Sequence, residues 1–292
     1  MRVNAGDSVA GHRLIERGAW YFAPFSLIYA SAVFIRNQLY NWLPVTKVPA
    51  TVVSVGNIVA GGTGKTPFVH ALAKAFAHRR VAILSRGYGT VPDEAMLLAR
   101  RLPNVQVYVG KNRAALAKAA DAELLILDDG FQYRRLHRDF DIVLVRQKKE
   151  HYLPWGFLRD SPRRLAEAEV IAVEDLKLNV NRILDLQGNE IPSIRGWKVA
   201  IFCGIAHPEN FKKTVRGLGA EIVAETIFAD HESASVGKLP KGLPLICTEK
   251  DAVKLPPTDL PIYFLEMEME VPDLEKWVER IDQKIDNRST YE

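Results

Sequence analysis

A glycine-rich loop between a predicted strand and a predicted helix constrains this chain more than any other feature. The apolar run Thr51–Val55 precedes it, and its residues are Gly61, Gly62, Thr63, Gly64, Lys65 and Thr66. A strand that turns on glycines into a helix aims backbone N–H groups and the positive end of the helix dipole at one anion. Lys65 adds a mobile positive charge for outer phosphates, and the Thr66 hydroxyl can bind Mg²⁺. The loop therefore predicts a nucleotide-binding α/β protein.

The loop departs from the strict phosphate-loop pattern at one position. That pattern places a glycine five residues before Gly64, where this chain has Val59, and the loop carries Gly61 and Gly62 instead. A glycine-rich turn without a ligand is the alternative interpretation. We favour a nucleotide site because Gly-Lys-Thr at a strand-to-helix junction is uncommon by chance.

Short apolar runs alternate with helix-forming stretches from residue 50 to about residue 145. This alternation predicts a parallel sheet with helices on both faces, of the type found in phosphate-loop NTPases. The expected strands are 51–55, 81–84, 105–109, 124–127 and 142–145, and the expected helices are 66–78, 93–101 and 113–120. Ligands of such sheets bind at the carboxyl ends of the strands.

A loop rich in Pro, Trp and Gly at 151–162 interrupts this pattern, and a second α/β set follows it. Its expected strands are 170–173, 199–202, 221–226 and 244–247, its expected helices are 208–218 and 273–286, and residues 182–191 predict a hairpin turn. We therefore expect three parts: an N-terminal helical segment (1–48), a phosphate-loop core (49–150) and a second, smaller α/β domain (151–292).

Composition narrows the class of partner. The formal net charge of +4 suits phosphate-bearing ligands or an anionic membrane face and is too small to indicate nucleic acid. The two cysteines, Cys203 and Cys247, lie in apolar runs, which predicts buried reduced thiols and a cytosolic environment. No segment indicates an obligate protein partner.

The N-terminal segment is aromatic and uncharged between Gly18 and Ile35, with Arg17 and Arg36 on either side. Pro24, two serines and two tyrosines argue against a membrane span. A helix that lies in the membrane interface is one interpretation, because aromatic side chains favour headgroup depth and arginines favour anionic lipids. A helix packed on the core is the other, and the residues do not decide between them.

Acidic residues follow the strand expected at 124–127. Asp128 and Asp129 end that strand, in the form of the second phosphate-loop element, whose carboxylate reaches Mg²⁺ directly or through water. An Asp pair in a surface turn is the alternative. Arg86 follows the strand expected at 81–84, where it could contact a phosphate.

Asp93, His231 and residues 248–251 allow two interpretations each. Asp93 opens a predicted helix, so it either caps that helix or accepts a proton from an attacking hydroxyl. His231 follows Asp230, and a lone histidine is more often structural. Thr248-Glu249-Lys250-Asp251 follows an expected strand and serves either as a charged helix cap or as a lysine aimed at the site.

Taken in order, these motifs resemble the tetraacyldisaccharide 4'-kinase (lipid A 4'-kinase) family over most of the chain. The resemblance rests on segments 54–58 and 61–67, 84–88, 127–132 with Arg134-Arg135 and Arg138-Asp139, 153–159, 228–231 and 248–251. It implies transfer of the ATP γ-phosphoryl group to the 4'-hydroxyl of a tetraacylated glucosamine disaccharide 1-phosphate. It also implies an enzyme at the cytoplasmic face of the bacterial inner membrane, held there by its N-terminal helix.

The resemblance also implies roles for individual residues. Asp93 and His231 would deprotonate the sugar hydroxyl, Lys65 would act in catalysis, and the acylated disaccharide would contact Asn57, Arg86, Tyr88 and Arg159. The Mg²⁺ ligands would be Thr66, Asp128, Asp129 and Asp160. Where the family has Glu then Pro after its arginine, this chain has Asp160-Ser161-Pro162.

Two other functions remain alternatives. A GTPase-type metallochaperone of the same architecture would carry a guanine-selecting Asn/Thr-Lys-x-Asp element, which residues 248–251 imitate with Glu249 before the lysine. A nucleotide-gated membrane adaptor would use residues 18–43 as its anchor and transfer no phosphate.

Overall fold

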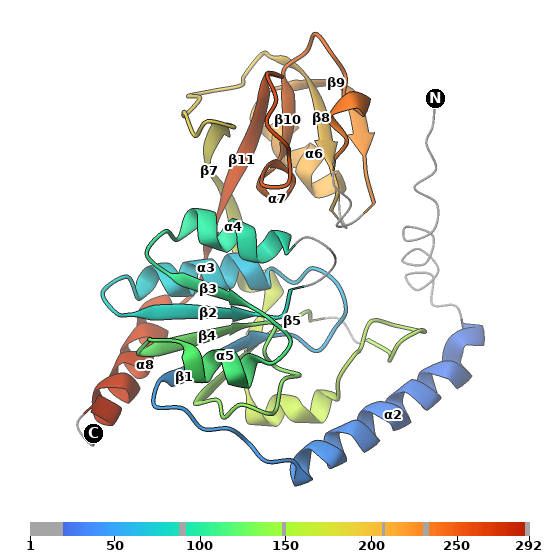
Figure 1. Cartoon of the computed structure of the whole chain (residues 1–292). Helices are drawn as coiled ribbons and strands as arrows, with labels where there is room; N and C mark the ends of the chain where they lie inside the picture. Colours follow the sequence, from blue (N-terminus) through green and yellow to red (C-terminus); the bar gives the residue numbers. More distant parts are fainter. Residues whose placement is uncertain (1–19, 88–91, 148–149, 206–207, 230–233, 290–292) are drawn as a thin grey trace. The chain divides into compact units, whose positions relative to one another are not determined.

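The computed structural model describes residues 20–87, 92–147, 150–205, 208–229 and 234–289. The chain forms two compact units, each built around its own sheet (Figure 1). Of the described residues, the larger unit comprises 20–87, 98–147, 150–177 and 269–289, and the smaller unit comprises 92–97, 178–205, 208–229 and 234–268.

The larger unit contains a six-stranded sheet in the order β3-β2-β4-β1-β5-β6. Every pairing in it is parallel. The strands are β1 (Thr51–Gly56), β2 (Val81–Ser85), β3 (Gln106–Val109), β4 (Leu124–Asp128), β5 (Phe140–Val145) and β6 (Glu169–Ala172). The central strands β1, β2 and β4 are buried along their whole length, as expected for a parallel sheet covered on both faces.

Helices cover both faces of this sheet. They are α3 (Lys65–Ala75), α4 (Asp93–Arg101), α5 (Arg113–Ala119) and α8 (Leu274–Ser289). Because side chains alternate along a strand, Val53 and Val55 pack with α3, the second half of α4 and α8. Val52 faces the opposite side, where it packs with Ala117 of α5. Arg280 of α8 lies over the Phe140 ring of β5, with its guanidinium carbon 5.8 Å from the ring centroid.

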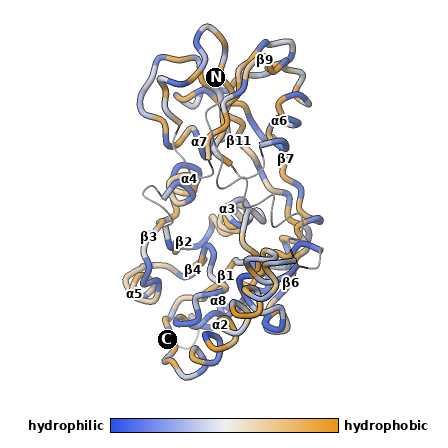
Figure 2. Tube along the Cα trace, turned by 90° about the vertical axis from the view of Figure 1, so that its right-hand side faces the viewer, coloured by the Kyte–Doolittle hydropathy of each residue, from blue (hydrophilic) through white to orange (hydrophobic). Residues whose placement is uncertain are grey.

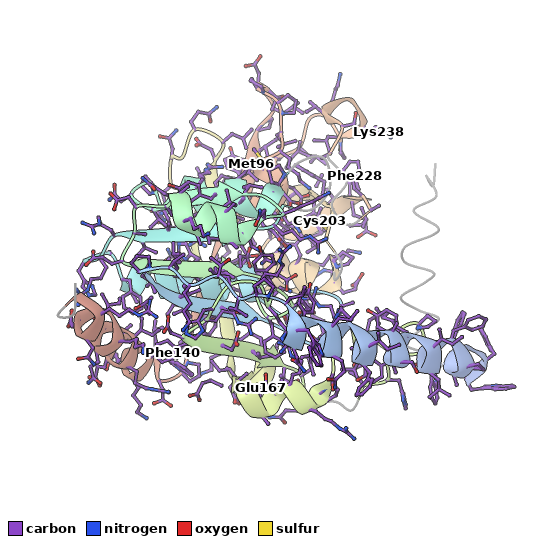
Figure 3. The ribbon with its side chains drawn as sticks, turned by 60° about the horizontal axis from the view of Figure 1, so that its bottom comes forward. Met96, Phe140, Glu167, Cys203, Phe228 and Lys238 are labelled. Atoms are coloured by element: carbon purple, nitrogen blue, oxygen red, sulfur yellow. The ribbon has the colours of Figure 1, made fainter. Side chains whose placement is uncertain are left out.

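The N-terminal helix α2 (Ala23–Trp42) follows the short 3-10 helix η1 (Trp20–Phe22). Only Ser26 and Val33 are buried in it, and its side chains project from the ribbon for most of its length (Figure 3). Hydrophobic residues run along the helix, interrupted by hydrophilic ones (Figure 2). Ser26 Oγ donates to the Tyr152 carbonyl oxygen at 2.7 Å, which attaches this helix to the larger unit.

The smaller unit contains a five-stranded sheet in the order β7-β11-β10-β8-β9, in which β8 to β11 pair in parallel. The strands are β7 (Lys177–Asp185), β8 (Lys198–Cys203), β9 (Glu221–Ile227), β10 (Leu245–Thr248) and β11 (Ile262–Glu270). Helix α6 (Pro208–Gly217) packs on one face and the short α7 (Glu249–Ala252) on the other. The remaining 3-10 helices are η2 (Pro162–Glu167), η3 (Val173–Asp175) and η4 (Val236–Lys238).

The predicted fold class, a phosphate-loop parallel sheet with a second α/β part and an N-terminal helix, is confirmed. The compact units nevertheless differ from the predicted limits of 1–48, 49–150 and 151–292. The strand expected at 170–173 is β6, which pairs with β5 in the first sheet. Helix α8, expected in the second part, supplies Ile281 and Ile285 to the core of the larger unit. Helix α2 also belongs to the larger unit.

Two features of the smaller unit differ in how well the sequence predicted them. The hairpin turn is confirmed: Asp185 N–H donates to the Asn189 carbonyl oxygen at 3.0 Å, and Gly188 has a φ of 90°. Strand β11 was missed, because glutamates alternate along its second half. One of them, Glu266, is buried and binds Arg182 through both carboxylate oxygens at 3.0 Å. Among the described residues, no helix combines the length and apolar character that crossing a bilayer requires.

Candidate active site

The loop after β1 has a backbone that depends on glycine. Gly61 and Gly64 have φ angles of 106° and 81°, in a region that residues with a side chain rarely adopt. Gly64 is the N-cap residue of α3, and Lys65 is the first residue of that helix. Because glycine has no side chain to cap the helix, the N–H groups of the first turn point into the loop without a side-chain acceptor from the cap position. This is the geometry of an anion site.

Asn57 holds the loop from inside. It is fully buried, and its Nδ2 donates to Thr63 Oγ1 at 2.9 Å. Its carbonyl oxygen accepts a bond from Gln132 Nε2 at 2.7 Å. Arg146 Nη2 donates to the Gly62 carbonyl oxygen at 2.8 Å, which supports the outer part of the loop. Asn57 therefore has a structural task here in addition to the predicted contact with substrate.

The acidic pair lies beside this loop, because β4 is the neighbour of β1 and Asp128 is in register with Val55. Asp128 and Asp129 are 2% and 8% exposed. Asp129 has a φ of 54°, which is uncommon for a residue with a side chain. The following Gly130 permits the tight turn, since a Cβ there would lie 2.6 Å from the Leu127 Cβ.

Arg113, at the start of α5, supports this turn and was not identified from the sequence. Its Nη1 donates to the carbonyl oxygens of Asp128 at 3.2 Å and Asp129 at 3.0 Å. Its guanidinium carbon lies 4.4 Å from the centroid of the Tyr133 ring, and the residue is 4% exposed. An arginine in the first turn of a helix is usually exposed to solvent, so nothing in the sequence indicates that Arg113 is buried.

A second arginine supports the same turn from the residues just before β5. Arg138 Nη1 donates to the carbonyl oxygens of Phe131 at 3.1 Å and Tyr133 at 3.3 Å, and Arg138 pairs with Asp141 at 3.0 Å. Burial raises the pKa of the Asp141 carboxyl and lowers the pKa of the Arg138 guanidinium. Both shifts are consistent with poor solvation of Arg138 and Asp141, which lie next to the Asp129 turn. Hydrogen bonds are stronger in such surroundings than in water.

Charged side chains from two segments converge on Asp129. Lys65 Nζ lies 3.6 Å from Asp129 Oδ1. Arg159 Nη1 donates to Asp129 Oδ2 at 3.1 Å, and Arg159 Nη2 donates to both Asp129 Oδ1 and Asn57 Oδ1. Four of the residues predicted for the site are thus in one cluster. Two cations around one carboxylate leave an excess of positive charge beside the loop, which suits a polyphosphate.

Asp160 does not fit its predicted role as a Mg²⁺ ligand. The residue is fully buried. Its Oδ1 accepts bonds from Asn37 Nδ2 at 3.0 Å and Ser161 N–H at 2.8 Å and pairs with Arg36 Nη2 at 3.0 Å. Its Oδ2 pairs with Arg164 Nη1 at 2.5 Å. Both carboxylate oxygens of Asp160 thus bond to protein donors, and two of these donors, Arg36 and Arg164, are cationic. These contacts do not favour metal binding by Asp160.

The other predicted metal ligands form a suitable set of donors. Thr66 lies in the first turn of α3, and Asp128 and Asp129 end the neighbouring strand. A hydroxyl and carboxylates are the hard oxygen ligands that Mg²⁺ prefers, and Mg²⁺ at phosphate sites takes one or two carboxylates with the remaining positions filled by phosphates and water. The chemistry of the set therefore fits Mg²⁺ held jointly with a nucleotide.

Asp93 lies in the smaller unit, between two lysines of residues 249–254. Its Oδ2 is 3.6 Å from Lys250 Nζ and 3.7 Å from Lys254 Nζ, and the residue is 2% exposed. Its Oδ1 accepts a bond from Glu94 N–H at 3.0 Å at the start of α4. Asp93 therefore helps to begin the helix and also pairs with both lysines. The two interpretations of Asp93 are compatible.

The segment 248–251 is a helix cap. The Thr248 side chain accepts a bond from Asp251 N–H at 3.3 Å at the start of α7, and Asp251 Oδ1 accepts a bond from Gly204 N–H at 3.1 Å. Burial raises the pKa of the Asp251 carboxyl despite its bond to Thr248 and its neighbour Lys254. This arrangement directs Lys250 to Asp93 and does not favour a guanine-selecting element.

Three further predicted residues complete the placement. Arg86 is exposed directly after β2, at the carboxyl edge of the larger sheet. Tyr88 and His231 lie outside the described residues.

A glycine loop between β1 and α3, with an acidic pair on the neighbouring strand, defines the larger unit as a nucleotide-binding domain of the phosphate-loop class. The family model of tetraacyldisaccharide-1-P 4'-kinase, LpxK, matches residues 18–286. The chain belongs to this family.

Relatives and a solved structure agree with this assignment. The chain is 33% identical to tetraacyldisaccharide 4'-kinase of Chlamydia trachomatis, over 85% of this chain and 83% of that protein. It is 34% identical to the protein of the same name in Anaeromyxobacter dehalogenans, over 82% of this chain and 83% of that protein. The crystal structure of LpxK from Aquifex aeolicus in complex with ATP matches with a TM-score of 0.80 at 30% identity, over 91% of this chain and 98% of that one.

Proposed function

We propose that this protein transfers the γ-phosphoryl group of ATP to the 4'-hydroxyl of a tetraacylated glucosamine disaccharide 1-phosphate, the step that forms lipid IVA in lipid A biosynthesis. The observation that carries the proposal is the cluster of Lys65, Asp129, Arg159 and Asn57 at the glycine loop, in a chain of this kinase family. The related LpxK structure, solved with ATP, supports ATP as the donor.

The residues of the larger unit would bind and orient the nucleotide. The loop N–H groups of residues 61–66 and the ammonium of Lys65 hold the outer phosphates, and Thr66, Asp128 and Asp129 hold the metal. When bound, Mg²⁺ neutralises charge on the transferring phosphoryl group and aligns it with its nucleophile. Arg159 and Asn57, fixed to each other beside the loop, would contact the substrate where transfer takes place, and Arg86 and Tyr88 would contact it near the edge of β2.

Asp93 and His231 would remove the proton of the attacking hydroxyl. Two lysines fix the position of the Asp93 side chain, with Lys250 Nζ at 3.6 Å and Lys254 Nζ at 3.7 Å from its Oδ2. We assign proton acceptance to His231 and orientation of its imidazole to Asp93. General-base assistance of this kind contributes about 10²–10⁴-fold to the rate.

Helix α2 would bind the membrane that holds the lipid acceptor. The exposed residues of α2, and of η1 directly before it, include Trp20, Phe25, Leu27, Ile28, Phe34, Ile35, Leu39 and Trp42. Trp42 is 87% exposed. Exposed apolar and aromatic side chains in this number mark an interaction surface, and rings favour the depth of the lipid headgroups. We therefore propose that α2 binds a membrane surface, and the kinase family implies that this surface is the cytoplasmic face of the bacterial inner membrane.

One assay tests this function. The full-length protein is incubated with γ-labelled ATP, Mg²⁺ and the purified acylated disaccharide 1-phosphate in detergent micelles, and the labelled lipid is separated by chromatography. We expect label on the lipid, a strong preference for ATP over GTP, and no transfer without Mg²⁺. Preferred GTP hydrolysis without lipid phosphorylation would favour a metallochaperone-type GTPase, and nucleotide binding without any transfer would favour a membrane adaptor.

A further inference from the structure

The carboxylate of Asp160 joins helix α2 to the segment that carries Arg159. From α2 it receives Arg36 Nη2 and Asn37 Nδ2, each at 3.0 Å. From η2 it receives Arg164 Nη1 at 2.5 Å. Asp160 is fully buried, whereas the Arg36 side chain is 37% exposed. The charge that α2 contributes is therefore held at the rim of the unit by an anion in its interior.

The adjacent residue makes the opposite set of contacts. Arg159 N–H donates to the Ile58 carbonyl oxygen at 2.9 Å, and its guanidinium binds Asp129 and Asn57. Two consecutive residues therefore contact different parts of the larger unit: Asp160 contacts α2, and Arg159 contacts the phosphate-binding loop and the acidic turn.

Arg164 forms a second connection between the same parts. Besides Asp160, it donates from Nη2 to the Phe131 carbonyl oxygen at 3.0 Å, and its guanidinium carbon lies 4.1 Å from the centroid of the Phe131 ring. Phe131 is two residues after Asp129, in the turn that bears the proposed metal ligands. Loss of the Asp160 charge would thus disturb the turn, because Arg164, which Asp160 orders, bonds the Phe131 carbonyl oxygen, and it would also loosen the chain segment that carries Arg159.

We propose that Asp160 is a positioning residue that couples the seating of α2 to Arg159, and through Arg159 to the phosphate-binding loop. The nucleotide site is then complete only when α2 packs against the rest of the larger unit. The proposal rests on the proposed function for the role of the loop in ATP binding. It assigns to Asp160 a different task from the metal binding that its place in the family pattern implies.

The coupling is tested from the α2 side, because the Arg36 side chain is 37% exposed and its substitution leaves the core packing intact. Arg36→Gln removes the cation from a half-exposed position, and Ser31→Ala is the matched control on the same helix, since Ser31 Oγ bonds only its own helix, at the Leu27 carbonyl oxygen 2.9 Å away. The affinity of each full-length variant for ATP is measured by calorimetry with Mg²⁺ in detergent. We expect Arg36→Gln to weaken ATP about 5- to 10-fold, the lower range of coupling between separate sites, and Ser31→Ala to stay within about twofold.

Two further measurements separate coupling from metal binding. In a double-mutant cycle, Arg36→Gln and Asp160→Asn together should weaken ATP no more than Asp160→Asn alone, because both act through one contact. The Mg²⁺ concentration for half-maximal activity should stay the same in Asp160→Asn. Wild-type ATP affinity in Arg36→Gln would overturn the proposal, and so would a large shift in Mg²⁺ requirement confined to Asp160→Asn. Since the readout is ATP binding, failure of the protein to phosphorylate the disaccharide would refute the proposed function alone.

Discussion

The carboxyl edges of the two sheets differ in how they satisfy the polar groups at the start of the helix that follows each strand. In the larger unit, β1 ends in a glycine loop, and Lys65, the first residue of the next helix, keeps a side chain that is 17% exposed. In the smaller unit, β10 ends in Thr248, whose side chain caps α7, and Lys254 beyond it is 1% exposed between two carboxylates. Both edges gather charge where parallel strands end.

The difference lies in what satisfies the polar groups. The N-cap residue of α7 is Thr248, whose side chain accepts a bond from the Asp251 N–H. The charge of Lys254 is paired with Asp93 and Asp251, so protein side chains satisfy the polar groups at this edge. Helix α3 begins after a glycine, which has no side chain to cap it. Among the described residues, Lys65 forms an ion pair with Asp129, with Nζ 3.6 Å from Oδ1. We infer that the first edge is built to receive an anion from outside, and that the second is built to hold the Asp93 side chain in one place.

The largest expected effect concerns Lys65. Lys65→Ala should reduce kcat/KM for phosphate transfer by about 10³-fold or more, since preorganised donors to a transferring phosphoryl group each contribute 10²–10³-fold or above. The measurement is initial-rate transfer of label from ATP to the acylated disaccharide. Thermal unfolding serves as the control and should be almost unchanged, because this side chain is at the edge of the unit. A variant with more than a tenth of wild-type kcat/KM would contradict an anion site at this edge.

The next effect tests the smaller unit. Asp93→Asn keeps the shape of the side chain and removes the charge that faces Lys250 and Lys254, and we expect kcat to fall about 10²–10⁴-fold. Glu94→Gln is the matched control, because Glu94 also faces Lys250, at 3.7 Å, but is not a predicted catalytic residue. ATP affinity should change little in either variant. Equal turnover in the two variants would show that the cluster around Asp93 is purely structural.

The sequence predicted the larger unit better than the smaller one. The larger sheet is made of contiguous apolar runs such as Leu124–Leu127, and those runs specify buried parallel strands directly. Strand β11 escaped because its alternating glutamates suggest an exposed strand or helix, and only the contact of Glu266 with Arg182 from another strand explains its burial. Pairings between distant segments leave no local signal, which is also why β6 and α8 were assigned to the wrong unit.

Site residues follow the same rule. The glycine loop and the acidic pair were found because each has a fixed spacing next to a strand, and the structure places them side by side. Arg113 acts through backbone carbonyl groups of a turn that is 15 residues away in the sequence, so no motif includes it. Asp160 had a motif position, yet its contacts with α2 depend on a segment more than 120 residues earlier. Residue type and spacing predict chemistry, whereas the assignment of each charge to its partner depends on the fold.

A moderate effect on stability should distinguish Gly56 from Gly62, two glycines at the carboxyl edge of the larger sheet. Gly56→Ala should lower the free energy of unfolding by about 1–3 kcal/mol, the cost of overpacking a core. A Cβ at Gly56 would lie 2.5 Å from the Phe131 Cβ and 2.9 Å from its backbone nitrogen. Gly62→Ala is the control: a Cβ there meets nothing within 4 Å, so stability should be unchanged or slightly higher. Urea unfolding monitors both, and equal stabilities would mean that the close approach of the acidic turn to β1 is not required.

The smallest effect is chemical and belongs to the smaller unit. Cys203, labelled in Figure 3, ends β8 and is fully buried, and burial raises the pKa of its thiol to about 12. The unfolded thiol ionises near pH 9.0, so folding retains the proton between that pH and about 12. The contribution of this thiol to stability is therefore present below pH 9 and is lost as the pH rises through the folded value. Because the thiolate is the reactive form, modification of Cys203 by a disulfide reagent, followed by peptide mass analysis, should be much slower in the folded protein than in urea at each pH between 7 and 9. A folded-state rate close to the rate in urea at the same pH would show that this end of β8 opens to solvent, and would remove the contrast between a closed edge and a receptive one.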